Sequence, residues 1–482
     1  MIKTRFAPSP TGDLHIGGLR TALFAYLFAK KNQGEFVLRI EDTDQTRYKE
    51  GSVTTILESL KWVNIKYDGE ITYQSKRTEI YQKYADELIK NGHAYYCFCS
   101  AETLDEMRQT QETKKQAPMY DRRCLNLSAE EIDKKLQAGE PYVIRLKIPT
   151  GQTKFTDLVR GQIEIDNSNI DDQVLIKSDG FPTYHLANVV DDHEMEITHV
   201  IRAEEWLPST PKHIILYQMF GWTPPEFAHL SIILAPDKSK LSKRHGATSV
   251  LEFKNLGYLP EAVVNYIALL GWNPGTDREI FSLEALEYEF SLDKVQKAGA
   301  VFDIEKLNWM NGHYIRQLSP DKLLELCRDY LPLTKGEPTR SKRYGGGESY
   351  NIDYLKKIVA LEQERLKKLS DITEATEYFF TEPTYEKELL QWRKSDLADA
   401  KNKLEFLFVE LEKVPAENFT RSALEQFIKG LIEAEKLDTG AVLWPMRAAL
   451  SGRKNSPGPF ELAEVLGKEK SLERIKKAIN II

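Results

Sequence analysis

The sequence has few cysteines, no long hydrophobic run and no excess of positive charge, and each of these shortages excludes a class of protein. Four cysteines, unevenly spaced in 482 residues, do not build a disulfide framework. No apolar run is long enough to cross a bilayer, so we expect no membrane partner. The net charge of -7 argues against bulk polyanion binding, but it permits a local basic path along a folded nucleic acid.

The start of the chain also lacks a recognisable targeting segment. The stretch "MIKTRFAPSP" contains neither an apolar signal-peptide core nor an amphipathic leader rich in Arg and Ser. The composition, 41% hydrophobic and 29% charged, is typical of a soluble globular protein. We therefore expect a cytoplasmic, monomeric protein whose length allows about three domains.

Strand and helix patterns alternate in the first part of the chain and give way to helices later. A strand at Phe36–Asp44 follows the helical stretch "LRTALFAYLFAKKNQG", and this βαβ order predicts a parallel sheet of α/β type. Near Tyr95 two cysteines, a charged helix and short strands, among them "DQVLIKSDGFPTYHLA", predict an inserted α+β module. From about Leu251 the apolar spacing is helical, interrupted by a Gly-rich and charged surface loop at Thr334–Asn351.

The stretch "RFAPSPTGDLHIGGLR" has the features of an anion site at the start of a helix. Gly12, Gly17 and Gly18 let a backbone approach a phosphate or a flat base closely, because no Cβ intervenes. His15, at the helix start, can donate a hydrogen bond to a phosphate oxygen. A plain Pro-Gly turn with a satisfied histidine is the alternative, and the length of the motif disfavours it.

A second motif, "KLSKRHG", follows the apolar strand "LSIILAP". It places Lys240 and Lys243 three residues apart, with Ser242 between them and Arg244 next. Mobile ammonium groups stabilise the charge that develops when an α-phosphate is attacked in line. A lone lysine-rich loop is usually a solvated surface, but the two motifs together favour ATP chemistry.

This pair of motifs resembles the HIGH and KMSKS signatures of class I aminoacyl-tRNA synthetases, here "HIGG" and "KLSKR". The fuller stretches "RFAPSPTGDLHIGGLRTALFAYLFAKKNQGEFVLRIEDTD" and "VVDDHEMEITHVIRAEEWLPSTPKHIILYQMFGW" resemble bacterial glutamyl-tRNA synthetases. The likeness extends more loosely to "LWPMRAALSGRKNSPGPFELAEVLG". Two positions depart from the family: Gly18 replaces the final His of the first signature, and Ala203 stands where Gly is usual.

The resemblance implies a Rossmann-like parallel-sheet catalytic domain with an inserted α+β module, followed by an all-α C-terminal half. Residues 1–75 and 187–250 are expected to form the catalytic domain, and residues 76–186 the inserted module for the tRNA acceptor end. Residues 251–330 would contact the tRNA stem, and residues 331–482 would bind the anticodon. The basic groups in "YLKKIV", "QERLKKL", "MRAAL" and "SGRKN" could contact phosphates or bases, although such groups are often solvated helix faces.

A dicarboxylic amino acid needs a cationic fork for its side chain and an acidic partner for its α-ammonium. Arg5 and Arg202, each near the end of a predicted strand, offer the bidentate geometry that lysine lacks. Glu41 is the candidate for the ammonium, with a simple Arg5–Glu41 ion pair as the alternative. Two arginines suit glutamate better than glutamine. By resemblance, the glutamate site also contains Ala7, Ser9, Tyr184 and Asn188.

By the same resemblance, the expected activity is glutamate–tRNA ligation. L-glutamate attacks the α-phosphate of ATP, which carries Mg²⁺, and the glutamyl group then passes to the 3′ end of tRNA(Glu); charging of tRNA(Gln) as well is left open. The expected catalytic residues are His15, Gly17, Gly18, Lys240 and Lys243. The expected ATP-binding residues are Gly12, His15, Gly17, Glu205, Trp206 and Lys243.

Three of the four cysteines fall in the inserted module. Cys97, Cys99 and Cys124, with Tyr120 as a phenolate, could supply four ligands to Zn²⁺. A subgroup of the family has Cys-x-Cys followed by Cys-x-His, but here Asn126 takes the place of the histidine. The alternative is three reduced thiols without metal, and Cys327 is expected in a helical core.

Two other functions compete with this interpretation. A small-molecule nucleotidyltransferase would share the ATP motifs, but it has no use for the long helical half. A catalytically silent RNA-binding relative is disfavoured by the intact "HIGG" and "KLSKR".

Overall fold

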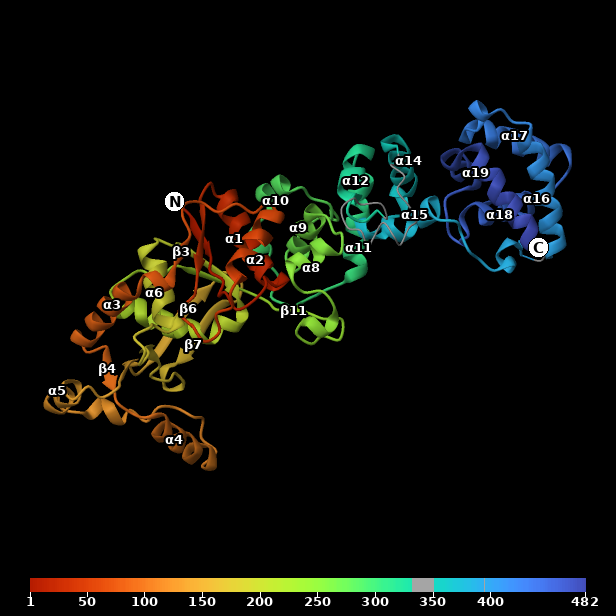
Figure 1. Cartoon of the computed structure of the whole chain (residues 1–482). Helices are drawn as coiled ribbons and strands as arrows, with labels where there is room; N and C mark the ends of the chain where they lie inside the picture. Colours follow the sequence, from red (N-terminus) through yellow and green to blue (C-terminus); the bar gives the residue numbers. More distant parts are fainter. Residues whose placement is uncertain (332–350, 394) are drawn as a thin grey trace. The chain divides into compact units, whose positions relative to one another are not determined.

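The computed structural model describes residues 1–331, 351–393 and 395–482, which belong to two compact units (Figure 1). The first unit comprises residues 1–255 and 260–307, and the second comprises residues 256–259 together with the described part of 308–482. The first is α/β and the second is helical, so the predicted fold class is confirmed. Most of the predicted loop Thr334–Asn351 lies outside the described residues; only Asn351 is described, as the N-cap of α14 (Ile352–Glu362).

A seven-stranded sheet forms the centre of the first unit, in the order β3-β2-β1-β9-β10-β6-β7. All neighbouring pairs run parallel except the β6–β7 hairpin. The strands are β1 (Lys3–Phe6), β2 (Glu35–Ile40), β3 (Thr72–Tyr73), β6 (Gln152–Asp157), β7 (Gly161–Asp166), β9 (His199–Ala203) and β10 (Glu226–Leu230).

The chain order of the strands reverses between β1 and β9, which are neighbours in the sheet through Thr4 and His199. In open parallel sheets, ligands bind beyond the carboxyl ends of the strands at such a reversal. Arg5 and Phe6 end β1, Arg202 and Ala203 end β9, and Glu41 follows the last residue of β2. The topology therefore brings the residues that are predicted to bind the substrate to one edge of the sheet.

Helix α1 (Ile16–Lys31) begins directly after the glycine-rich turn and packs against β1, β2 and β9. Ten of its sixteen residues are buried, since "LRTALFAYLFA" is apolar on most sides. Lys30 and Lys31 in its last turn complement the negative end of the helix dipole. Gly34 then lets the chain turn into β2, because a Cβ there would lie 2.1 Å from the Ile2 carbonyl oxygen.

Residues 76–186 contain a smaller antiparallel sheet in the order β4-β5-β8 and three helices. These elements are α3 (Thr78–Lys90), β4 (Ala94–Cys97), α4 (Ala101–Thr113), α5 (Ala129–Gln137), β5 (Val143–Leu146) and β8 (Val174–Ile176). The hairpin β6–β7 comes from the same stretch but extends the main sheet through β10. The predicted module boundaries stay a prediction.

One predicted strand is wrong over most of its length. In "DQVLIKSDGFPTYHLA" only Val174–Ile176 is extended in β8, and the chain turns at Gly180 before α6 (Tyr184–Glu194) begins. Gly180 has a φ of +81°, which glycine adopts without strain. Helices α6 and α7 (Thr210–Met219) then pack in the same apolar cluster as buried residues of β9 and β10.

Four shorter helices and a pair of short strands also belong to the first unit. They are α2 (Ser52–Trp62), α8 (Val250–Asn255), α9 (Pro260–Leu269), α10 (Leu283–Glu289) and the small parallel pair β11 (Ile233–Leu234) and β12 (Ala300–Val301). The boundary between the units falls within α11 (Ile304–Arg316).

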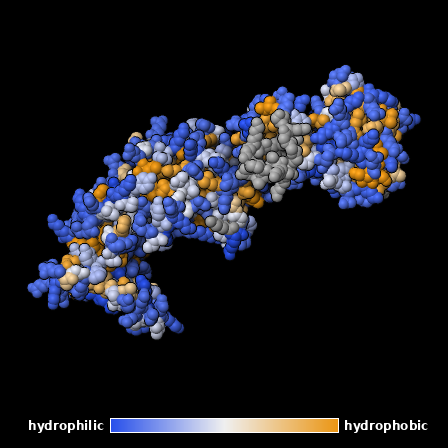
Figure 2. All heavy atoms as spheres, viewed as in Figure 1, coloured by the Kyte–Doolittle hydropathy of each residue, from blue (hydrophilic) through white to orange (hydrophobic). Residues whose placement is uncertain are grey.

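The second unit consists of helices over its described residues. They are α12 (Pro320–Cys327), α14, α15 (Ile372–Phe380), α16 (Leu397–Glu412), α17 (Arg421–Ala434), α18 (Thr439–Ser451) and α19 (Pro459–Ile481). Hydrophilic side chains cover most of the visible face of each unit (Figure 2). None of the helices in the described parts of the chain is long and apolar enough to span a membrane.

Candidate active site

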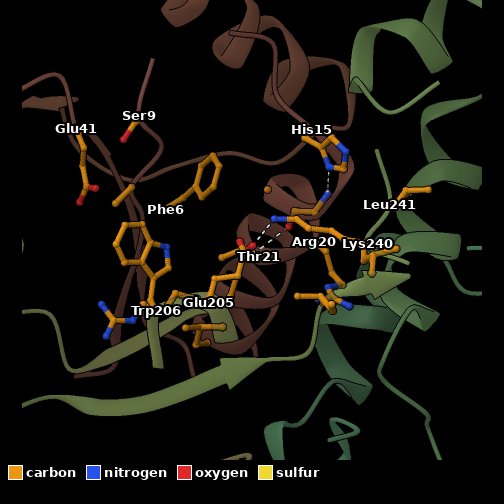
Figure 3. A pocket seen from close by; sticks show the side chains of 18 of the residues that line it. Phe6, Ser9, His15, Arg20, Thr21, Glu41, Glu205, Trp206, Lys240 and Leu241 are labelled. Carbon is orange, nitrogen blue, oxygen red and sulfur yellow. Dashed lines mark hydrogen bonds and ion pairs between the residues drawn. The ribbon is translucent and has the colours of Figure 1, made fainter. Parts of the chain in front are cut away.

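A cavity of about 610 Å³ opens beyond the carboxyl ends of β1 and β9. Most of the predicted site residues line it, namely Arg5, Ala7, Ser9, His15, Gly17, Gly18, Glu41, Tyr184, Arg202, Glu205, Trp206 and Lys240. Figure 3 shows Glu41 and Ser9 toward one end and His15 and Lys240 toward the other, with Phe6 and Trp206 between them. The cavity is therefore an elongated site with chemically distinct ends.

Two predicted residues, Asn188 and Gly12, are placed differently. Asn188 lies behind the wall, almost fully buried, where its amide oxygen accepts from Arg5 at 3.2 Å. Gly12 lines an adjacent cavity of about 320 Å³ that shares Ser9 and His15 with the first. Lys243 begins the short helix η5 (Lys243–His245), directly after the cavity residue Ser242.

Sequence reasoning missed several wall residues: Phe6, Arg20, Thr21, Ile201, Ile232, Ile233 and Leu241. Arg20 had a detectable signal, since it is the one charged residue in the apolar stretch "LRTALFAYLFA". Its guanidinium donates to the carbonyl oxygens of Leu270, at 3.1 Å, and of Ser231. Burial lowers the pKa of Arg20 to about 10. Arg20 thus ties the start of α1 to neighbouring loops.

The hydrogen bond that caps the N-terminus of α1 determines which ring nitrogen of His15 carries the proton. Its Nδ1 accepts a hydrogen bond from the Gly17 backbone N–H at 3.0 Å. A nitrogen that accepts carries no proton, so the neutral ring is protonated on Nε2. Nε2–H is therefore the group of His15 that can donate to an anion.

Packing, rather than backbone conformation, favours glycine at position 18. A Cβ at Gly18 would lie 2.9 Å from Cδ1 of Leu14, which is shorter than such contacts normally are. The side chain of a histidine at this position would need Leu14 to move. The departure of "HIGG" from the family signature is thus consistent with local packing.

Arg5 and Glu41 do not pair with each other; each contacts a different residue. Arg5 donates to Asp192 at 3.0 and 3.3 Å, and Arg39 donates to Glu41 at 3.1 Å and to Asp192 at 2.7 Å. The alternative of a plain Arg5–Glu41 pair is therefore not what the structure has. Burial raises the pKa of Glu41, against the lowering effect of the nearby Arg39 and Arg5 charges.

Arg202 is buried but has no carboxylate partner within 4.0 Å among the described residues. Its guanidinium donates to neutral acceptors instead: His229 at 3.0 Å, Tyr184 at 2.9 Å, Thr210 at 2.9 Å and His213 at 3.3 Å. A buried, uncompensated cation in a cavity wall favours an anionic group in the cavity.

Tyr184 and Trp206 form an aromatic wall beside Arg202. Their ring centroids are 4.2 Å apart, and Trp206 remains 40% exposed. The burial of Tyr184 raises its pKa, so the hydroxyl stays protonated and can donate into the cavity while it accepts from Arg202. The exposed indole offers a flat face to a planar ligand.

The "KLSKR" stretch forms a loop after β11. Lys240 makes an ion pair with Glu205, and both side chains are more than half exposed. Ser242 is held by His245, whose Nδ1 accepts from the Ser242 backbone N–H at 3.2 Å. Since an exposed ion pair is worth little, Lys240 can leave Glu205 for a more highly charged ligand at small cost.

Three cysteines and a tyrosine converge in the inserted module. The Sγ atoms of Cys97, Cys99 and Cys124 all lie within 4.8 Å of one another. The Tyr120 hydroxyl lies 3.3 Å from Cys97 Sγ and 3.5 Å from Cys99 Sγ. Hydrogen bonds from Cys124 and Tyr120 lower the pKa of Cys97 to about 4. Three sulfur atoms and one hydroxyl thus lie close together, and these are ligand types that Zn²⁺ accepts.

Cys327 is fully buried in α12, and burial raises its pKa to about 12. The prediction that it belongs to a helical core is confirmed.

The chain matches two families along nearly its whole length. Residues 1–309 match the tRNA synthetases class I (E and Q), catalytic domain, and residues 322–479 match an anticodon binding domain. It is 48% identical to glutamate–tRNA ligase 2 of Thermoanaerobacter pseudethanolicus, over 100% of this chain and 98% of the relative. It is 47% identical to the glutamate–tRNA ligase of Dehalococcoides mccartyi strain BAV1, over 99% and 97%.

A solved structure has the same fold over its full length. This is the crystal structure of a glutamate tRNA ligase from Elizabethkingia meningosepticum in complex with its amino acid. It is 38% identical, with a TM-score of 0.88 and coverage of 99% of both chains.

Proposed function

Because the chain belongs to the class I tRNA synthetases for glutamate and glutamine and is a glutamate–tRNA ligase, we propose that the 610 Å³ cavity is where it joins glutamate to AMP. The α-carboxylate of glutamate attacks the α-phosphorus of ATP, and the bond from that phosphorus to pyrophosphate breaks. The 3′-terminal ribose hydroxyl of tRNA then displaces AMP. The attacking carboxylate is already ionised, so the protein supplies position and charge rather than a general base.

The observation that carries the glutamate assignment is the uncompensated Arg202. Its neutral surroundings leave a full positive charge for the side-chain carboxylate of the substrate. Glu41 has one oxygen on Arg39, and its other oxygen is available to the α-ammonium. The remaining residues assigned to glutamate are Arg5, Ala7, Ser9, Tyr184 and Asn188.

The opposite end of the cavity suits the phosphates of ATP. His15 offers Nε2–H, and Gly17 and Gly18 allow close approach at the start of α1. Lys240 and Lys243 supply the charge that grows on the leaving pyrophosphate. Gly12, Glu205 and Trp206 are assigned to the rest of the nucleotide. When bound together with ATP, Mg²⁺ would screen the charge of the phosphates.

The proposal is tested by pyrophosphate exchange with and without tRNA. A glutamate–tRNA ligase with this site exchanges pyrophosphate into ATP only when glutamate is supplied, and Arg202→Leu should abolish this exchange at ordinary glutamate concentrations. Exchange driven by another acid in place of glutamate would refute the assignment of the cavity. A silent relative would give no exchange under any condition.

The partners follow from the second unit. The anticodon binding domain implies contact with tRNA, and we assign anticodon reading to the helices between residues 351 and 482. Two tryptophans there carry arginines over their rings, Arg393 on Trp392 at 4.7 Å and Arg447 on Trp444 at 4.5 Å. Such basic and aromatic groups can stack on bases. Charging of tRNA(Gln) in addition to tRNA(Glu) stays an open part of the proposal, as do a monomeric state and a cytoplasmic location.

We also propose a structural Zn²⁺ ion in the inserted module, held by Cys97, Cys99, Cys124 and the Tyr120 oxygen. The fit rests on the convergence of three sulfur atoms and one phenol within bonding range of a common centre. When bound, the ion would link β4 to the turn that contains Tyr120 and Cys124. Elemental analysis of the purified protein should give about one zinc per chain. Cys124→Ser should lower this content, whereas Cys327→Ser should leave it unchanged.

A further inference from the structure

Three neighbouring strands place Asp157, His229 and Arg202 in line. His229 on β10 is the register partner of Arg202 on β9, and Asp157 ends β6, which pairs with β10. All three side chains are buried, and none was singled out by the sequence except Arg202. The contacts run from Asp157 to His229 Nδ1 at 2.6 Å and from His229 Nε2 to Arg202 Nε at 3.0 Å.

The arginine determines which nitrogen of His229 is protonated. A guanidinium only donates, so His229 Nε2 must accept from Arg202. The proton of the neutral ring then lies on Nδ1 and is donated to Asp157. Asp157 is itself fixed by the backbone N–H groups of Val159, Arg160 and His229, at 2.8 to 3.1 Å.

A second branch starts at the other end of the guanidinium. Arg202 Nη1 donates to His213 Nδ1 at 3.3 Å, and His213 Nε2 lies 3.1 Å from His185 Nδ1. By the same rule, His213 accepts through Nδ1 and donates its Nε2–H to His185. The guanidinium carbon of Arg202, Cζ, lies 5.5 Å from the centroid of the Phe227 ring. Four hydrogen bonds to uncharged groups thus hold the guanidinium of Arg202 in the cavity wall.

We propose that His229 and His213 are positioning residues that aim Arg202 at the substrate without neutralising it, and that Asp157 fixes His229 for this task. The inference rests on the proposed function, since it takes Arg202 to bind the side-chain carboxylate of glutamate. A carboxylate in either histidine position would aim the guanidinium equally well. Such a carboxylate would also neutralise the positive charge of Arg202. The preference for glutamate over glutamine, its neutral amide, would then be weaker.

The contrast with two other buried arginines supports the inference. Arg5 and Arg39 both pair with Asp192, and Arg39 also pairs with Glu41. Their charges are therefore balanced inside the protein. Arg202 is held by hydrogen bonds of similar length, yet Asp157, the carboxylate that lies beyond His229, is separated from it by the imidazole ring.

The two histidines contact Arg202 through different nitrogens, and this gives a crossed test. Asn can mimic the Nδ1 position of an imidazole and Gln the Nε2 position. His229→Gln and His213→Asn therefore keep an acceptor for Arg202, whereas His229→Asn and His213→Gln lose it. All four variants stay polar and similar in size. His199→Gln, on the same strand as Arg202 but directed at Thr198, is the matched control.

The readout is aminoacylation of tRNA(Glu) by the full chain, with KM measured for glutamate and for ATP. We expect His229→Asn to raise the glutamate KM about tenfold to hundredfold, the scale of one hydrogen bond to a charged group. His213→Gln should raise it less, because that bond is longer. The two acceptor-keeping variants and the control should stay within about threefold, and the ATP KM should not change.

Arg202→Leu separates this inference from the proposed function. If it leaves the glutamate KM unchanged, the cavity assignment itself is wrong. If it raises the KM but the Asn and Gln variants at each histidine behave alike, the positioning role is overturned and the proposed function stands. Equal increases in the glutamate KM and the ATP KM would also overturn the positioning role. Such a result would indicate a general structural defect, which has no reason to affect glutamate alone. Should His229→Asn fail to fold, Thr210→Val removes a different acceptor of Arg202 and is expected to raise only the glutamate KM.

Discussion

The first unit buries neutral histidines around Arg202, and we therefore expect acid to destabilise this unit. Burial lowers the pKa of His185 to about 3, and burial together with the Arg202 charge places the pKa of His213 well below its usual value. The unfolded chain has ordinary histidines that titrate near pH 6.5. Between pH 6.5 and the folded pKa, the unfolded state therefore binds more protons. The free energy of unfolding is at its full value above pH 6.5 and falls as the pH drops through this window.

The size of the effect follows from linkage. Each histidine that stays neutral in the fold should cost about 2 kcal/mol at pH 5, from the ratio of protonated to neutral imidazole in the unfolded chain. His185 and His213 together should remove about 4 kcal/mol. His229, whose pKa is also lowered by burial, adds to this loss.

The assay is urea unfolding followed by circular dichroism at intervals between pH 7.5 and pH 5. His213→Asn provides the comparison, because it removes one titrating group and keeps the acceptor that faces Arg202. The free energy of unfolding of His213→Asn should fall less steeply with decreasing pH than that of the unsubstituted protein. The two slopes should differ by up to about 1.4 kcal/mol per pH unit at the acid end. Parallel curves for the two proteins would mean that His213 is not a neutral buried ring, and the reasoning would be refuted.

Other predictions address the chemistry and the partners. Lys243→Ala should lower kcat for adenylate formation by about two to three orders of magnitude, with a smaller change in ATP affinity; an unchanged rate at saturating substrate would exclude this lysine. Arg202→Leu should raise the glutamate KM steeply at near-normal ATP KM, since it removes the positive charge that no carboxylate balances within the residues that the structure describes, and a normal glutamate KM would contradict this. Arg447→Gln in the helical unit should weaken tRNA binding and reduce its salt dependence, whereas Lys413→Gln, already paired with Glu410, should not; equal effects would remove Arg447 from the interface.

Much of the site could be predicted because strand ends carry its chemistry. Arg5, Glu41 and Arg202 each stand at or just after the end of a strand, and parallel strands bring such residues to one edge. The motif around His15 gave the helix start, since a glycine-rich turn before an apolar helix has few other uses. The helical second half followed from apolar spacing alone.

The supporting network could not be predicted, because its members carry no local signal. Asp157 and His229 are separated by 72 residues, and each looks like an ordinary polar residue at a strand end. Their pairing depends on β6 joining the main sheet, which the sequence pattern had placed in the inserted module. The pairing of Arg5 and Arg39 with Asp192 was also hidden, since Asp192 lies in the last turn of α6, far from both arginines in the sequence.

The place of β9 between β1 and β10 has a consequence for how the chain folds. β1 can pair with β2 as soon as about forty residues exist, but its other neighbour begins at His199, about 160 residues later. A ribosome making this chain therefore exposes one edge of β1 for many seconds, at ordinary elongation rates of roughly 5–20 residues per second. The buried Arg5 lacks Asp192 during that time. Non-local pairing of this kind slows folding and leaves an unpaired strand edge open to aggregation.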